Sequence, residues 1–413
     1  MRILSGAAAA TRVGKMAARG SQYAHVEPAV RRIIVDVRKH GDRAVRKYAE
    51  RWEGLSRREP IRVSEEEINA AWKSASAELR NSLRAAAANI RRFCEWQKPA
   101  EWMRTRQGVS VGQIVRPLDS VGCYVPGGRY PLVSTLLMTV IPAQVAGVQN
   151  IRVVSPQSRT EVLAAAGMLG VREVYRIGGA QAIAALAYGT KSVPRVDKIV
   201  GPGSVYVTAA KKLVSFDCAI DFLAGPTEVV IVSDKGNAEF IAADLVAQAE
   251  HDTEIFAAFI TTDDKLAQQV ARATEKLSAG NPVARKSLCR NGAILVSSSR
   301  LQSFEWANEL ASEHLTVDAG DVALVRNAGS IFVGDYSPQA AGDYASGPNH
   351  VLPTGGAARF RGGLSVLDFV KVISVQRLSR PGLKSIAAVV ESLANAEGLR
   401  AHADSIRTRV AHA

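Results

Sequence analysis

The stretch "VDKIVGPGSVYVTAAKKLV", residues 196–214, sets the fold class of this chain. It begins with a short apolar strand and continues with a glycine turn. Apolar residues with the spacing of a helix follow the turn. The same order recurs over residues 120–148, 150–171, 173–189, 228–252, 254–277 and 292–314. Repeated strand–turn–helix units are typical of parallel, doubly wound sheets. We therefore expect an α/β protein with two Rossmann-like domains and helical segments at both termini.

The composition excludes several classes of protein. The 413 residues are 47% apolar and 22% charged, and the net charge is 52 − 39 = +13. Basic residues are interleaved with acidic ones and no nucleic-acid-binding signature appears, so we expect no nucleic-acid partner. No run of about 20 apolar residues predicts a membrane span. The four scattered cysteines indicate a reducing, cytoplasmic setting. The first 22 residues lack Asp and Glu, which fits a transit peptide or a helical arm, and we favour the arm.

The segment "DLVAQAEHD", residues 244–252, carries several polar residues on a predicted helix. Gln248 and His251 are three residues apart and share one helix face. Four of the seven histidines lie in dense polar clusters: His251, His314, His350 and His402. Zinc takes nitrogen and oxygen ligands, so Gln248 and His251, with Asp343 and His402 as distant partners, form a candidate metal set. On the residues alone, structural histidines and a metal or acid–base site remain equally open.

Three glycine turns end predicted strands, at residues 122–128, 178–186 and 201–207. Such turns bring backbone N–H groups toward a pyrophosphate at a switch point of the sheet. None of them matches G-x-G-x-x-G, because Tyr206 stands where "GPGSVY" would need its third glycine. Each of these turns can therefore be interpreted either as a phosphate-binding loop or as an ordinary turn before a helix.

Taken together, the motifs resemble one family, the zinc-containing, NAD-dependent histidinol dehydrogenases. The resemblance runs in order along nearly the whole chain. It includes "GCYVPGG", "IPAQVAGV", "GGAQAIAALAYGT", "VDKIVGPG", "AGPTEVVIVSD", "AQAEHD", "SEHL", "AGDYASGPNHVLPT", "LSVLDFVK" and "AEGLRAH". It implies a two-step oxidation of a primary alcohol, by family default L-histidinol, through an aldehyde to a carboxylate, with two NAD and one Zn²⁺ per subunit.

The resemblance also implies roles for individual residues. Glu313 and His314 from "SEHL" would be the acid–base pair. Zinc would be held by Gln248, His251, Asp343 and His402, with His402 supplied by the partner in an intertwined homodimer with shared active sites. Residues that would contact substrate are Thr227, His350 and Glu397, and those that would contact NAD are Tyr124, Gln181 and Ser204.

Four positions depart from the family pattern. Ser204 replaces the usual Asn, Ser312 the usual Pro and Thr227 the usual Ser. Arg129 in "GGRYP" adds a cation near the predicted substrate and cofactor sites, where it suits an anionic group. The "GGRYP" stretch also resembles the corresponding stretch of relatives in the same family that oxidise dihydroxypropanesulfonate. An anionic alcohol therefore stays open as the substrate beside histidinol, as does a non-catalytic metal- or ligand-binding role.

The resemblance divides the chain into five segments. We expect an N-terminal helical arm over 1–28, a helical first part of the zinc/catalytic domain over 29–118 and an NAD-binding Rossmann-like domain over 119–223. The second part of the zinc/catalytic domain would span 224–365, and a helical dimerisation tail would span 366–413. Within the second segment, Ser64 and Glu67 predict a capping box at a helix start.

Overall fold

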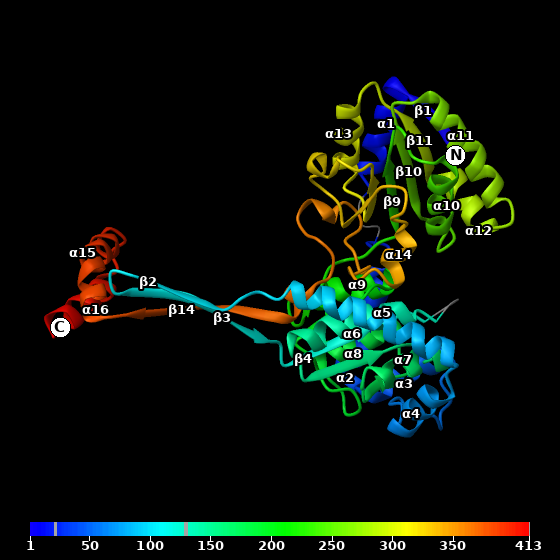
Figure 1. The fold of residues 1–413 in the computed structure, drawn as a ribbon. Coiled ribbons are helices and arrows are strands. Elements are labelled where there is room, and N and C mark those ends of the chain that lie inside the picture. Colours follow the sequence, from blue (N-terminus) through cyan, green and yellow to red (C-terminus); the bar gives the residue numbers. More distant parts are fainter. Residues whose placement is uncertain (20–22, 128–130, 413) are drawn as a thin grey trace.

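The computed structural model describes residues 1–19, 23–127 and 131–412. The chain forms two α/β lobes and a thin arm that projects away from both of them (Figure 1). We call them the six-stranded lobe, the five-stranded lobe and the arm. The predicted α/β class with two parallel, Rossmann-like sheets is confirmed.

The six-stranded lobe is built on one fully parallel sheet. In order across the sheet, its strands are β1 (Arg2–Ser5), β11 (Gly292–Val296), β10 (Phe256–Thr261), β9 (Glu228–Val232), β12 (His314–Val317) and β13 (Ser330–Val333). Helices α1 (Gly6–Ala17) and α13 (Arg300–Leu310) cover one face, and α10 (Ala238–Ala249), α11 (Asp264–Ser278) and α12 (Pro282–Asn291) cover the other. Alternate residues of β9 enter the two cores, as the two-residue period of a strand requires.

The five-stranded lobe repeats this plan. Its parallel strands run in the order β6 (Glu173–Tyr175), β5 (Asn150–Val154), β4 (Ser120–Tyr124), β7 (Lys198–Val200) and β8 (Ala219–Ile220). One face is covered by α4 (Glu65–Ser74), α5 (Ala77–Trp96), α6 (Val133–Ala146) and α7 (Thr160–Met168). The other is covered by α2 (Glu27–His40), α3 (Asp42–Trp52), α8 (Gly179–Tyr188) and α9 (Val205–Val214).

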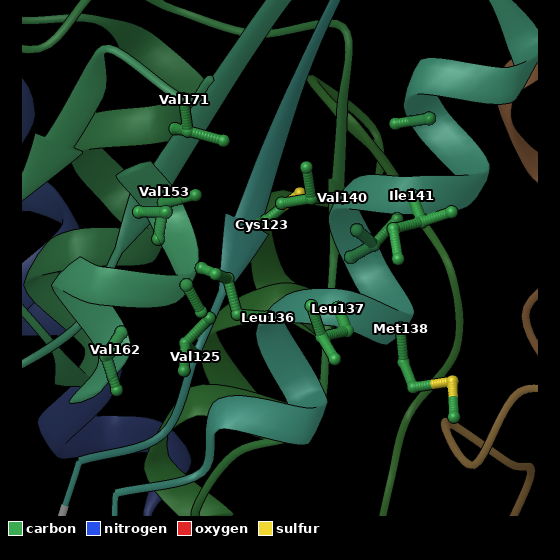
Figure 2. Packing of buried hydrophobic residues seen from close by; sticks show 14 of the residues in the cluster. Cys123, Val125, Leu136, Leu137, Met138, Val140, Ile141, Val153, Val162 and Val171 are labelled. Atoms are coloured by element: carbon green, nitrogen blue, oxygen red, sulfur yellow. The ribbon is translucent and has the colours of Figure 1, made fainter. Parts of the chain in front are cut away.

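The core under α6 shows how this lobe is held together. In Figure 2, Cys123 of β4 and Val153 of β5 belong to the same cluster as Leu136 and Val140 of α6. All four side chains are fully shielded from solvent. Residues that are apolar all round the helix make α6 a buried helix rather than an amphipathic one.

The arm is a three-stranded antiparallel ribbon that carries two helices at its tip (Figure 1). It consists of β2 (Trp102–Arg106), β3 (Val109–Pro117), β14 (Val370–Leu378), α15 (Arg380–Ala396) and α16 (Arg400–Ala411). The β2–β3 turn has positive φ at Gln107 and Gly108, the conformation that a tight hairpin needs. Many of its apolar side chains face solvent: Trp102, Met103, Val372, Ile373, Val389, Leu393 and Leu399.

The remaining short elements follow β12 in the chain, and all but one of them lie between β13 and β14. They are α14 (Gln339–Tyr344) and the 3₁₀ turns Val322–Leu324, Ala357–Arg359 and Val366–Phe369. Helix α14 lies where the two lobes meet (Figure 1). Asn349, just beyond it, donates to the carbonyl of Met138 in α6 across 2.6 Å, which ties this segment to the five-stranded lobe.

Three features of the fold differ from the expected segments. Residues Arg2–Ser5 form the edge strand β1, which joins the first 28 residues to the six-stranded sheet. The helices over 29–118 pack on the five-stranded sheet, because their apolar stripes share its two cores. The C-terminal tail begins with a 3₁₀ turn and β14, a nine-residue strand, before its two helices. The capping box at Ser64 and Glu67 is confirmed, with both reciprocal hydrogen bonds present.

Candidate active site

Glu313 and His314 lie at the amino end of β12, which runs between β9 and the edge strand β13 of the six-stranded sheet. Helix α13 ends just before them at Ala311, whose φ of 46° is left-handed and turns the chain into the strand. Ser312, where the family has Pro, donates its hydroxyl to the carbonyl of His314 across 3.0 Å. Glu313 is 7% exposed and His314 is 3% exposed. The sheet therefore buries two adjacent titratable side chains at one point.

The carboxyl group of Glu313 is held by the neighbouring strand. Its Oε2 accepts from the backbone N–H of Glu228 across 3.1 Å and lies 3.7 Å from Nδ1 of His314. Burial raises the pKa of Glu313 to about 8, and the nearby Glu228 adds to that effect. A carboxyl group with this pKa exchanges a proton near neutral pH, which is what a general acid–base group needs.

His314 lies between two carboxylates and a carbonyl. Its Nδ1 is 3.3 Å from the carbonyl oxygen of Glu228, and its Nε2 is 3.5 Å from Oδ1 of Asp343. Burial alone lowers the pKa of His314, but ionised Glu313 and Asp343 outweigh that effect, so the pKa is raised. Nε2 is buried and has no hydrogen-bond partner within the described residues. One ring nitrogen is therefore available for chemistry.

Asp343 and Gln248 approach this pair from two helices. Asp343 is on α14, and the fully buried Gln339 anchors that helix to β12 by donating to the hydroxyl of Thr316 across 2.7 Å. Gln248 is in the last turn of α10 and donates from Nε2 to Oδ2 of Asp343 across 3.0 Å. Burial tends to raise the pKa of Asp343, yet the hydrogen bond from His314 holds it below its ordinary value.

Two more predicted histidines lie close by. Helix α10 ends at Ala249, so His251 lies beyond the helix and is exposed. His350 places Nδ1 2.7 Å from the backbone oxygen of Asp343. Burial lowers the pKa of His350, and the proximity of His314 and His251 adds to the lowering. The structure thus brings Gln248, His251, Asp343 and His350 to the same edge of the sheet as His314.

Within the parts of the chain that the structure describes, no group of three His, Cys, Asp or Glu side chains is arranged to hold a metal ion. Asp343 and Gln248 are nevertheless hydrogen-bonded to each other, and their oxygens, with a nitrogen of His251, are donors that zinc accepts. His402 and Glu397 lie on the arm, far from both lobes (Figure 1), and both are exposed. The residues fit a zinc site whose donor set one chain leaves incomplete.

The predicted NAD residues gather at the carboxyl ends of strands in the five-stranded lobe. Tyr124 ends β4 and its hydroxyl accepts from the backbone N–H of Gly179 across 3.1 Å. Ser204 is the N-cap residue of α9, next to β7. The chain order of the strands reverses beside β4, between β4 and β7, which is where ligands bind in open α/β sheets.

Glu53 is a member of this group that the sequence analysis missed. Its Oε1 accepts from Nε2 of Gln181 and from the backbone N–H of Gly178, both across 2.7 Å. Burial raises the pKa of Glu53 to about 7. Glu53 lies just after α3, in a loop that no motif marks. Nothing in its sequence surroundings predicts a contact with residues more than 120 positions away.

Two predicted substrate contacts remain. Thr227 lies just before β9, and its carbonyl accepts from Phe256 across 3.1 Å. Arg129 lies outside the described residues. Glu228, which the sequence analysis also missed, did leave a signal, because an acidic residue begins the otherwise apolar strand "EVVIV".

None of the helices described is long and apolar enough to cross a membrane.

Known proteins resemble the chain over most of its length. The histidinol dehydrogenase family model matches residues 16–410. A histidinol dehydrogenase from Methanothermobacter thermautotrophicus is 47% identical over 392 residues, which is 92% of each chain. One from Methanosarcina barkeri is 46% identical over 411 residues, 96% of this chain and 94% of the relative.

A solved structure gives the same answer for the fold. The crystal structure of histidinol dehydrogenase from Elizabethkingia anophelis matches with a TM-score of 0.95 at 35% identity, covering 100% of this chain and 98% of that one. The chain is thus an oxidoreductase of the type that oxidises an alcohol in two steps with the loss of four electrons. Its sequence and its fold place it in the histidinol dehydrogenase family.

Proposed function

We propose that this chain oxidises L-histidinol through the aldehyde to L-histidine, with NAD as oxidant and one Zn²⁺ per subunit, as a step of histidine biosynthesis. The observation that carries the proposal is the buried Glu313–His314 pair, with Asp343 3.5 Å from His314. The relatives at 45–47% identity are histidinol dehydrogenases, which supports this substrate over an anionic alcohol.

In the first oxidation, His314 is the base. The alcohol loses its O–H proton to the imidazole as the C–H hydrogen leaves with its electron pair. Nε2 is the nitrogen that lacks a hydrogen-bond partner in the described part of the chain, so it is the one that takes the proton. The interaction of Nδ1 with the carbonyl of Glu228 at 3.3 Å favours the tautomer that leaves Nε2 free.

In the second oxidation, Glu313 activates water. Its carboxylate removes a proton as the water oxygen adds to the aldehyde carbon, which gives the singly ionised hydrate. This anion then loses its C–H hydrogen with its electron pair and becomes the carboxylic acid. The raised pKa of Glu313 makes its carboxylate a stronger base than an exposed Glu. Each NAD, when bound, accepts one hydride.

Gln248, His251 and Asp343 would hold the zinc, together with His402 from a second copy of the chain. Zinc, when bound, orients the substrate and polarises the alcohol oxygen that loses its proton. Thr227 and His350, with Glu397 from the second copy, would contact the substrate. Asp343 has a second task that needs no metal, because its carboxylate faces Nε2 of His314 and favours the protonated imidazole.

The position of the arm supports the proposal of a homodimer with shared sites. Glu397 is the C-cap residue of α15 and His402 lies in α16, the two helices at the tip of an arm that extends away from the lobes of its own chain (Figure 1). The ribbon and its helices also expose apolar side chains such as Trp102, Val372 and Leu393. An apolar surface on a protruding arm is typical of a segment that packs against a second subunit.

We place the NAD site on the five-stranded lobe, against Tyr124, Gln181 and Ser204. The support is their position near the point where strand order reverses. All four cysteines are free thiols, and Cys94, Cys123 and Cys218 are buried, which suits the reducing cytoplasm where we place the enzyme.

The test is NADH production by purified, zinc-loaded protein with L-histidinol and, in parallel, dihydroxypropanesulfonate. We expect about two NADH per histidinol consumed, as a four-electron oxidation requires, and loss of activity after chelation. Turnover of the sulfonate alone would replace histidinol as the substrate. Full activity after exhaustive chelation would contradict the zinc assignment, and zinc binding without any turnover would favour a binding protein.

A further inference from the structure

Arg19, which follows α1, forms a two-pronged ion pair with Glu228, the first residue of β9. Nε of Arg19 donates to Oε1 across 2.6 Å, and Nη2 lies 2.6 Å from Oε2. The side chain of Glu228 is only 3% exposed and that of Arg19 is 21% exposed. A fork of this kind fixes the orientation of both partners as well as balancing their charges.

The same guanidinium also holds the ends of two helices. Nη1 donates to the carbonyl of Met16 in α1 across 2.5 Å, and Nη2 donates to the carbonyl of Leu310 across 3.0 Å. The ring of Phe256 packs against the guanidinium, with 4.7 Å between the centre of the ring and Cζ of Arg19. Leu310 is the last residue of α13 and lies three residues before Glu313. Arg19 therefore fixes the chain immediately upstream of the catalytic pair.

Glu228 fixes the pair from the other side. Its backbone N–H donates to Glu313 across 3.1 Å, and its carbonyl oxygen is 3.3 Å from Nδ1 of His314. The side chain of Glu228 is held in turn by Arg19 and by the backbone N–H of Gly355, which donates to Oε1 across 2.8 Å. Glu228 thus cannot move without disturbing both Glu313 and His314.

Removing the cation would leave a buried carboxylate without its charge partner, which is strongly unfavourable. Glu228 would then turn toward water or take up a proton. Either change alters the contact that its side chain makes with the backbone N–H of Gly355, and the backbone that contacts Glu313 and His314 would shift with it.

We propose that Arg19, acting through Glu228, is a positioning residue for the Glu313–His314 pair. Its guanidinium joins the end of α1, the end of α13 and the start of β9 at the point where the catalytic residues begin. The proposal rests on the function proposed above for Glu313 and His314. It adds a residue from the first 28 positions to the active site of the six-stranded lobe.

The test compares Arg19→Gln and Arg19→Lys with Lys15→Gln, an exposed change in the last turn of the same helix. For Arg19→Gln we expect kcat with L-histidinol to fall about 10- to 100-fold, as small misplacements of reacting groups do. KM for histidinol and for NAD should stay within about twofold, because neither binding surface is touched. Arg19→Lys should recover part of kcat, and Lys15→Gln should match the wild type.

A chemical rescue separates positioning from general stability. Arg19 is partly exposed, so methylguanidinium added to Arg19→Gly should enter the space and raise kcat in a saturable way. Circular dichroism and zinc content, measured at the assay temperature, establish that the variants are folded and loaded. If Arg19→Gln does not fold, Arg19→Lys and the rescue carry the test. A kcat equal to wild type, or a loss that follows thermal stability and is not rescued, overturns the proposal.

The two proposals fail in different ways. If wild-type protein does not oxidise histidinol, the proposed function fails whatever Arg19 does. The positioning role is then decided by crystal structures of the wild type and Arg19→Gln. Displacement of the Glu313 carboxylate in the variant supports the role, and an unmoved carboxylate refutes it.

Discussion

Gln248 and Asp343 are 95 residues apart in the chain, and the amide of one donates to the carboxylate of the other across 3.0 Å. Gln248 comes from the end of α10 and Asp343 from the short helix α14. Their contact brings two motifs of the predicted metal set together beside His314. It makes the metal assignment testable one residue at a time.

Asp343→Asn should lower zinc content and activity together. The substitution keeps the size of the side chain but removes the negative charge that faces Nε2 of His314 and the predicted metal. We expect about a 10- to 100-fold loss of zinc affinity, the scale of change for groups that tune a metal site. Zinc per chain after dialysis measures it. Asp335→Asn, an exposed change at the opposite edge of the sheet, is the control, and equal zinc content in both variants would contradict the assignment.

The two catalytic residues should separate the two half-reactions. Glu313→Gln should block oxidation of the aldehyde more than that of the alcohol, and His314→Ala should slow the first hydride transfer. Each loss should be about 10²–10⁴-fold, the range for general acid–base groups. Single-turnover assays started from histidinol and from the aldehyde measure the two steps, with Glu309→Gln, exposed on α13, as control. Wild-type rates in both variants would refute these roles.

Shared sites predict complementation between inactive chains. His402→Ala and His251→Ala should each be inactive, because each removes one predicted zinc ligand. In a mixed dimer, one of the two sites keeps both ligands, so mixing should restore part of the activity. The assay follows NADH production after subunit exchange, which is verified with tagged chains. No recovery after complete exchange would mean that each chain completes its own site.

Glu53 should make stability depend on pH. Burial raises its pKa from 4.5 to about 7 in the folded chain. The protonated side chain therefore favours the folded state fully below about pH 4.5, and this contribution is lost as the pH rises to about 7. Glu53→Gln keeps an oxygen for the N–H of Gly178 but cannot ionise, so it should be more stable than wild type by about 1–3 kcal/mol at pH 8.

Urea unfolding at pH 5 and pH 8 measures the effect of this substitution. The gain in stability should shrink toward pH 5, and Glu95→Gln, on the exposed face of α5, is the matched control. An equal gain at both values of pH would show that ionisation of Glu53 is not the cause.

The sequence predicted the two parallel sheets because each repeat carries its own evidence: an apolar strand, a glycine turn and a helix. It did not predict β1, since residues Arg2–Ser5 are too few to show an alternating pattern and form a strand only by pairing with β11. The sequence also does not show which of the two sheets the helices α2 to α5 pack against, for a related reason. An amphipathic helix shows that it has an apolar face, but not which sheet will cover that face.

Much of the candidate site could also be predicted, but from motifs rather than from spacing. The spacing predicts that Gln248 and His251 share a helix face, whereas the helix ends at Ala249 and His251 follows it. Glu53 and Arg19 carry no local signal, because each matters only through a partner more than 120 residues away. Long-range ion pairs of this kind depend on how the elements pack, which a single sequence does not encode locally.

The proposed catalytic pair lies at the amino end of β12, beside the amino end of β9, so the opposite edge of the six-stranded sheet is left to other uses. The loops at that edge, such as residues 233–237 and 297–299, hold none of the predicted site residues. A dye, an affinity tag or a tether to a solid support attached at the exposed Ser298 would therefore face away from the reacting groups. That edge is therefore a suitable attachment site for immobilising this enzyme or for following its assembly by fluorescence.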